Sequence, residues 1–190
     1  MTSFQVGFIC TLLAVSGISY AQTNRRAGQS RLGSADQQFI TEAARANMAE
    51  IEIGQLAEER ASSQDVKNFA REMVQDHQKA NDQLQQLASS YGVSLPASIS
   101  SEDADLRSRL ASLSGSDFDK QFVESMLKGH KEAIAKFDDE AARGSDPSVK
   151  SYAAETLPVL QNHMRMAEDL AGKLGVSPSP SLNPGGAVTR

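Results

Sequence analysis

Apolar residues recur every three or four positions along four long stretches of the chain, the spacing of helices that bury one face. The pattern predicts a first helix at about 36–61 and a second that follows a Ser62-Ser63 cap and ends near Tyr91. A third is expected at about 117–143 and a fourth from the Ser145-Asp146 cap to Gly175, with a short amphipathic helix at about 101–111. Small residues on the apolar face of the first helix allow a neighbouring helix to approach closely.

The chain also repeats itself without gaps at a shift of 83 residues. The matched pairs include Asp36 with Asp119, Phe39 with Phe122, Ile51 with Ile134, Ser62 with Ser145, Lys67 with Lys150 and Gly92 with Gly175. Two copies of one helical hairpin, joined by a long crossover, give a ferritin-like bundle. The sequence therefore predicts an all-α, ferritin-like four-helix bundle over residues 36–175, with the short helix inside the crossover.

The two ends of the chain differ from this central part. Residues 1–21 carry no charged side chain and end in Ser-Tyr-Ala, which is typical of a cleaved signal peptide, with a retained anchor as the alternative. Residues 22–35 are expected to form a flexible arm, and residues 176–190, rich in Pro and Gly, a disordered tail. Cleavage would remove Cys10, so the mature chain could use neither a thiolate nor a Cys-zinc site.

Composition narrows the class of partner. The formal net charge is −5 and aromatic residues make up 5% of the chain, which disfavours a basic, stacking groove for nucleic acid. Nothing after the leader is apolar enough for transmembrane integration. A homo-oligomer remains open. The predicted location is therefore the periplasm or the surface of the cell envelope.

The chemical signal lies in the only three histidines, His77, His130 and His163. Each lies on the apolar stripe of a different helix, about fourteen to sixteen residues from a helix end, or ~21–24 Å along the axis. The matching level of the first helix holds Asn47 and Glu50. Three imidazoles with the Glu50 carboxylate would suit one metal ion. The alternative is a buried polar network, in which each histidine bonds Glu50, Asn47 or another histidine.

The identity of such an ion depends on the neighbouring residues. Three methionines, Met73, Met126 and Met166, share helix faces with the histidines and are alternative soft ligands, which would favour copper over zinc or iron. Methionines at helical spacing also commonly fill a core. Di-iron sites need a Glu three residues before two of the histidines, and the residues there are Val74, Leu127 and Leu160. The sequence therefore disfavours di-iron chemistry.

Three motifs give the chain a family resemblance. They are Phe69-Ala70-Arg71-Glu72-Met73-Val74-Gln75-Asp76-His77, Gly129-His130-Lys131-Glu132-Ala133 and Thr156-Leu157-Pro158-Val159-Leu160-Gln161-Asn162-His163. Over about 36–175 the sequence resembles an exported bacterial family defined by a domain of unknown function (DUF4142), whose members are often labelled predicted outer membrane proteins. The resemblance implies a ferritin-like bundle in the cell envelope, and no reaction.

Two functions are consistent with these observations. The first is a non-enzymatic, exported bundle that binds a metal ion or a partner in the envelope. The second is a ferritin-like, metal-dependent oxidoreductase or metal-storage protein. Where a metal is bound, it would be a single transition-metal ion (zinc, iron or copper) at the histidines, and the second function requires it whereas the first does not.

Overall fold

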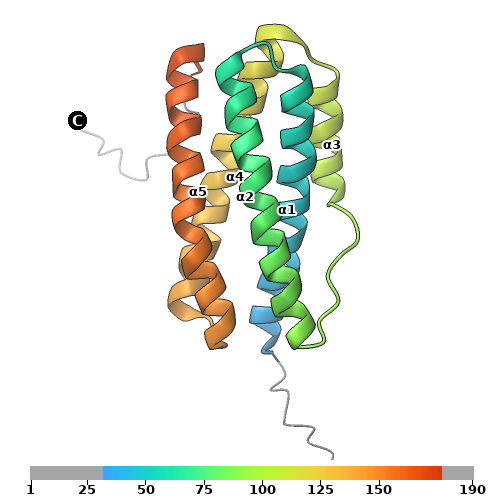
Figure 1. The fold of residues 1–190 in the computed structure, drawn as a ribbon, viewed down its shortest axis with the longest axis vertical. Helices are drawn as coiled ribbons and strands as arrows, with labels where there is room; N and C mark the ends of the chain where they lie inside the picture. The colour runs from blue at the N-terminus through green and yellow to red at the C-terminus, as the bar shows by residue number, and fades with distance from the viewer. Residues whose placement is uncertain (1–31, 177–190) are drawn as a thin grey trace, which may run out of the picture.

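The computed structural model describes residues 32–176, which form five helices (Figure 1). They are α1 (Ser34–Arg60), α2 (Gln64–Ser90), α3 (Ser101–Ala111), α4 (Gly115–Arg143) and α5 (Pro147–Leu174). This confirms the predicted all-α fold. Helices α1 and α4 begin two residues earlier than the sequence predicts. The expected signal peptide, most of the arm and nearly all of the tail lie outside the described residues.

The four long helices form two antiparallel hairpins, α1–α2 and α4–α5 (Figure 1). The segment 91–100 and α3 connect one end of the bundle to the other, so α2 and α4 run in the same direction. Helix α3 lies outside the four and packs against α1 and α4. Among the described helices, none has an apolar stretch long enough to cross a membrane.

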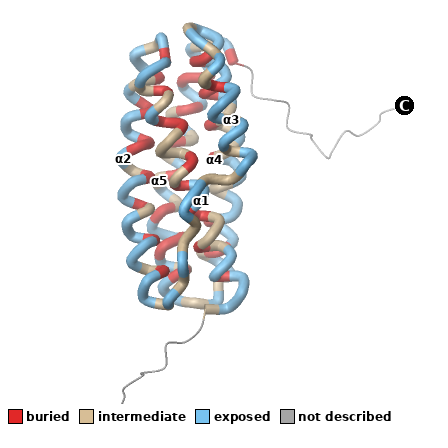
Figure 2. The backbone as a smooth tube through the Cα atoms, turned by 90° about the vertical axis from the view of Figure 1, so that its right-hand side faces the viewer, coloured by how far each residue is buried: buried red, intermediate tan, exposed pale blue. Residues whose placement is uncertain are grey.

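Buried residues line the inner side of every long helix (Figure 2), and they form two separate apolar clusters. One cluster centres on Phe69, Phe118 and Phe122, and the other on Phe137 and Leu84. The buried polar residues at mid-depth, Asn47, His77, His130 and His163, belong to neither cluster. On each helix they stand between residues of the first cluster and residues of the second, so a polar layer divides the core.

The hairpin turns are capped across the two halves of the molecule. Asp119, in the first turns of α4, accepts hydrogen bonds from the backbone N–H groups of Ser62 and Ser63 and from the Ser62 hydroxyl. Asp36, in the first turn of α1, accepts one from the backbone N–H of Ser145. The serines were expected to cap α2 themselves, but the Ser63 side chain makes no cap bond. Because the buried Asp119 carboxylate satisfies these N–H groups, the serine hydroxyl is not needed as the acceptor.

The second of these turns contains a carboxyl pair that the first lacks. Asp36 faces Glu140, and burial together with this neighbouring acid raises the pKa of Glu140 to about 7. Asp36 Oδ2 and Glu140 Oε1 are both buried without another partner. In the first hairpin, 83 positions earlier, the residue that corresponds to Glu140 is Ala57, and the residue that corresponds to Gly144 is Ala61. A Cβ at Gly144 would lie 2.3 Å from Glu140 Oε1, so glycine there leaves room for the larger side chain.

We expect Glu140→Gln to stabilise the bundle at pH 8 by about 1–2 kcal/mol, with little effect at pH 4.5. The folded-state pKa lies above the unfolded value, so folding binds the proton, and the stability it contributes is lost as pH rises from about 4.5 through about 7. The expected energy is smaller than the full pKa shift would give, because water at the end of the bundle screens the interaction between the two carboxyl groups. Urea unfolding of wild type and variant across this range measures the difference. The exposed Asp138→Asn is the matched control, and equal pH profiles for Glu140→Gln and wild type would contradict the pairing.

Candidate metal centre

The polar layer brings three histidine rings together from three helices. His77 comes from α2, His130 from α4 and His163 from α5, and all three are buried. One nitrogen from each ring lies within 4.8 Å of the other two. The ring centroids are 5.3 Å apart for His130 and His163, 5.4 Å for His77 and His163, and 6.0 Å for His77 and His130. The structure thus brings together the three histidines that the sequence singled out.

On the side that faces away from the other two histidines, the His77 ring is hydrogen-bonded to a residue of α1. Its Nδ1 lies 3.0 Å from Asn47 Oδ1, and the amide of Asn47 in turn donates to the Tyr152 hydroxyl at 3.3 Å. Since Oδ1 only accepts, the ring hydrogen is on Nδ1. His77 Nε2 therefore carries a lone pair, and this atom is buried with no hydrogen-bond partner. The bond to Asn47 is one that the sequence raised as the alternative to a metal.

The other two histidines have outer partners that also only accept. His130 Nδ1 lies 3.0 Å from the backbone carbonyl of Met126, so its hydrogen is on Nδ1 and its Nε2 has the lone pair. His163 Nε2 lies 3.0 Å from Asp76 Oδ2, which places the hydrogen of a neutral ring on Nε2. Both outer partners thus fix the tautomer that leaves a nitrogen lone pair facing the centre.

The two inner nitrogens, His130 Nε2 and His163 Nδ1, are 3.3 Å apart. A hydrogen bond between them needs a hydrogen on His163 Nδ1. If a neutral His163 carries its hydrogen on Nδ1, its Nε2 has a lone pair instead. This lone pair then faces the Asp76 carboxylate, which also only accepts. With every ring neutral, one of the two contacts therefore joins two acceptors, and either a second proton on His163 or a bound cation removes this conflict.

Burial keeps the cluster close to neutral. Desolvation, reinforced by the neighbouring histidines, lowers the pKa of His77 well below its ordinary value. Desolvation and His130 also lower the pKa of His163, although Asp76 partly opposes them. A charged imidazole in an apolar core would be costly without a partner. These shifts favour the neutral rings of His77 and His163, and the neutral imidazole is the protonation state that binds metals.

The spacing of these nitrogens suits one shared ion. Two nitrogens bound at about 2.0 Å to the same ion are at most about 4 Å apart. The 3.3 Å between His130 and His163 meets this limit. All three nitrogens lie within 4.8 Å of one another, so no separation would have to shorten by more than about 1 Å to bind one ion.

The remaining residues that the sequence proposed lie around the cluster. Glu50 lies against α4, with Oε1 3.5 Å from where a Gly129 Cβ would be, and its Oε2 is buried without a partner. Desolvation raises the pKa of Glu50, against the opposing influence of His130. Met73 and Met126 pack in the apolar cluster around Phe69, whereas Met166 is partly exposed between α2 and α5. Among the described residues, no carboxylate has an atom within the 4.8 Å group of histidine nitrogens.

Sequence reasoning missed two residues of this site. Asp76 adjoins His77 in the sequence, and its carboxylate reaches the histidine of another helix, His163. Tyr152 lies on the buried face of α5, and its hydroxyl accepts a hydrogen bond from the Asn47 amide. Neither contact has a signal in one sequence, because both join residues about 90 to 105 positions apart.

The family of the chain follows from its sequence. A family model for DUF4142, described as a domain of unknown function, matches residues 21–170. The chain belongs to the DUF4142 family. No curated protein matches it. The resemblance carried by the three histidine-containing motifs is therefore confirmed at the level of the family.

Solved structures show the same fold at low sequence identity. A DUF305 fragment from Deinococcus radiodurans superposes with a TM-score of 0.68 at 17% identity, covering 75% of this chain and 99% of the fragment. CopM in its Cu(I)-bound form superposes with a TM-score of 0.61 at 17% identity, covering 73% of this chain and 96% of CopM. CopM is also known in Cu(II)-bound and Ag-bound forms. The DUF4142 chain thus shares a helical fold with proteins that include a copper-binding one.

Proposed function

We propose that this DUF4142 protein is a non-enzymatic, exported bundle that binds one monovalent copper ion between His77, His130 and His163. The observation that carries the proposal is the facing pair of acceptors, His130 Nε2 and His163 Nδ1, 3.3 Å apart in a buried layer. A cation between them removes the conflict and leaves both outer hydrogen bonds in place. His77 Nε2, buried and without a partner, supplies the third ligand.

Charge favours a monovalent ion over a divalent one. A buried ion is stable only when nearby groups compensate its charge. Within residues 32–176, Asp76 is the only carboxylate that hydrogen-bonds a ring of the cluster, and its single negative charge balances Cu(I). Compensating Zn²⁺ would also need Glu50 ionised, and desolvation raises the pKa of that carboxyl. Imidazole ligands in a water-poor site are also compatible with Cu(I), and the copper-bound and silver-bound forms of CopM lend the proposal support.

Anaerobic titration against a chromophoric Cu(I) chelator tests the proposal. We expect one Cu(I) per chain, tighter binding of Cu(I) and Ag(I) than of Zn²⁺, and no binding beyond the first equivalent. Two results would count against it: no binding to untagged protein, or Zn²⁺ bound as tightly as Cu(I).

We expect Asp76→Asn to weaken Cu(I) binding roughly 10- to 100-fold, because it removes the charge that balances the ion and replaces a group that only accepts with an amide that can present either a donor or an acceptor to His163. The asparagine retains the size of the side chain, so the fold should persist. Asp82→Asn, at an exposed position on the same helix, changes the net charge equally and should leave the affinity unaltered. Equal losses in the two variants would mean that Asp76 acts only through the overall charge.

A further inference from the structure

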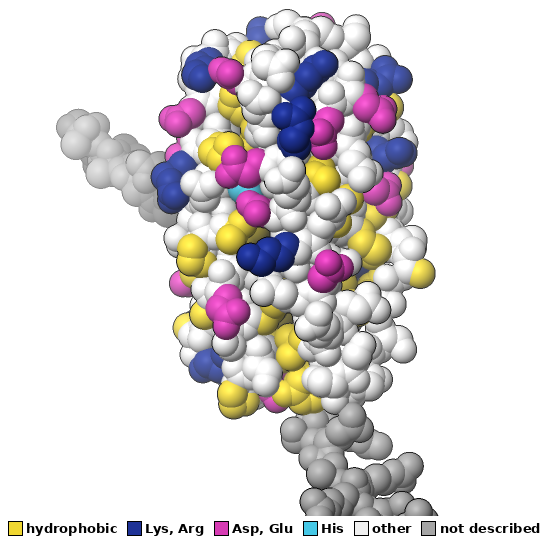
Figure 3. All heavy atoms as spheres, viewed as in Figure 1, with side chains coloured by type: hydrophobic (Ala, Val, Ile, Leu, Met, Phe, Trp, Pro, Cys, Tyr) yellow, Lys and Arg dark blue, Asp and Glu magenta, His cyan; other side chains and the backbone are white. Residues whose placement is uncertain are grey.

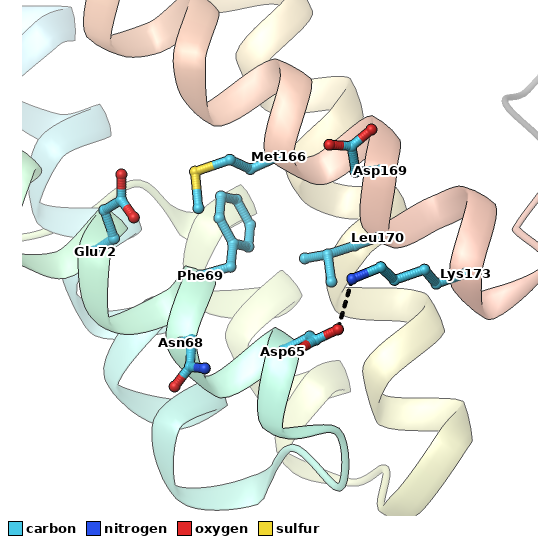
Figure 4. Close-up of a pocket in the computed structure, with 8 residues that line it drawn as sticks. All are labelled: Asp65, Asn68, Phe69, Glu72, Met166, Asp169, Leu170 and Lys173. Carbon is cyan, nitrogen blue, oxygen red and sulfur yellow. Dashed lines mark hydrogen bonds and ion pairs between the residues drawn. The ribbon is translucent and has the colours of Figure 1, made fainter.

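A groove follows the seam between α2 and α5, on the outer side of His163. Phe69 and Glu72 line it from α2, and Met166 and Leu170 from α5. The Met166 side chain extends across the groove between Glu72 and Phe69, and an ion pair between Asp65 and Lys173 closes one end (Figure 4). Met166 is the one proposed soft ligand that is not fully buried.

Polar contacts hold the Met166 sulfur at the surface. The Asn162 amide lies 3.5 Å from Met166 Sδ and 3.3 Å from Glu72 Oε1, so it connects the thioether to the carboxylate on the facing helix. A partly exposed thioether beside a carboxylate combines a soft donor for Cu(I) with a negative charge that attracts cations.

Beside Phe69, which lines the groove, lies the one histidine of the cluster whose outer partner is open to solvent. The Asp76 side chain is 38% exposed, whereas Asn47 is 3% exposed and the third outer acceptor is a backbone carbonyl inside α4. Asp76 lies one helical turn beyond Glu72, and the Phe69 ring meets the His163 ring edge-on, with centroids 6.2 Å apart. Figure 3 shows acidic side chains beside a small patch of histidine on this face, and the His163 side chain itself is 0% exposed to water.

We propose that this groove is the loading route of the histidine centre, with the Met166 thioether as the first ligand of an incoming Cu(I). The inference rests on the proposed function. Glu72 and Asp76 draw the cation to the seam, Met166 binds it, and it passes beside Phe69 to His163. Met166 is one turn from His163 on the same helix, so the transfer covers a short distance, and because His163 is fully buried the side chains at the seam have to move aside for the ion to enter. In the loaded state the ion is bound by the three histidines, and Met166 is free again.

Stopped-flow loading with Ag(I) or Cu(I) tests the route on the full chain. Met166→Leu keeps the size and apolar character of the side chain, so the fold should be retained. We expect loading to be roughly tenfold slower, and the equilibrium dissociation constant to change by less than about threefold, because the final ligands are untouched. The matched control is Met164→Leu, at a partly buried position on another face of α5, which should load at the wild-type rate.

The outcomes separate this inference from the proposed function. Loading at the wild-type rate in Met166→Leu would overturn the route while leaving the histidine centre intact. An unchanged loading rate with a large loss of affinity would make Met166 a ligand of the final site, which also overturns it. Wild-type protein that takes up no Ag(I) or Cu(I) at equilibrium would refute the proposed function, and the route with it.

Discussion

Asp119→Ala should lower the free energy of unfolding by about 3 kcal/mol, as measured by urea denaturation at pH 7. The carboxylate is buried and accepts two backbone N–H groups and a hydroxyl from the α1–α2 turn. Alanine leaves these donors without a partner at the start of α2, and hydrogen bonds to charged groups are among the stronger ones.

The corresponding residue of the second half provides the control. Asp36→Ala removes one hydrogen bond, from the backbone of Ser145, and also relieves the contact between Asp36 and Glu140. Its cost should therefore be smaller, below about 1 kcal/mol. Equal losses in the two variants would show that Asp119 has no more capping role than its counterpart.

His77→Ala and His163→Ala are expected to abolish the stabilisation that Cu(I) gives the wild type. A ligand that binds only the folded state, present at about 1,000 times its dissociation constant, adds about 4 kcal/mol. For a domain of this size the gain corresponds to a rise of roughly 10 °C in Tm. Calorimetry with Cu(I) and with a chelator measures the difference, which should vanish in both variants.

A purely structural role for the three histidines predicts a different result. If the cluster is only a polar network, the wild type will show the same Tm with metal and with chelator. Each alanine variant will then be less stable by about 1–3 kcal/mol in both conditions, because a buried partner loses its hydrogen bond. That pattern would exclude the metal centre and leave the histidines a structural role.

The helices were predictable because their signals are local. Apolar periodicity and Gly, Pro and Ser at the ends give α3 and the last residue of α4 correctly and place the other ends within one or two residues. The expected close approach to the first helix is also seen: a Cβ at Gly54 would lie 2.6 Å from Val74 Cγ2. The repeat predicts that the two hairpins superpose, and the crossed pair Asp36 and Asp119 is consistent with it.

The candidate site was predictable only in part. Depth along antiparallel helices is set by the rise per residue, so histidines near mid-helix on three buried stripes could be expected at one level. Contacts between side chains on different helices have no comparable signal in the sequence. For this reason neither the contact of Asp76 with His163 nor the Asp36–Glu140 pair could be anticipated. The role of Glu50 as a fourth ligand remains a prediction.

The crossed caps also determine how the bundle comes apart. Asp119 completes the turn of the hairpin to which it does not belong, and Asp36 does the same for the other. Neither turn can keep its cap once the hairpins separate, so local opening of one half should not be available short of global unfolding. The backbone amides of Ser62 and Ser145 would then exchange their hydrogens only when the whole molecule unfolds. An ion bound by histidines of both hairpins would shift that same equilibrium toward the state in which the two hairpins are joined.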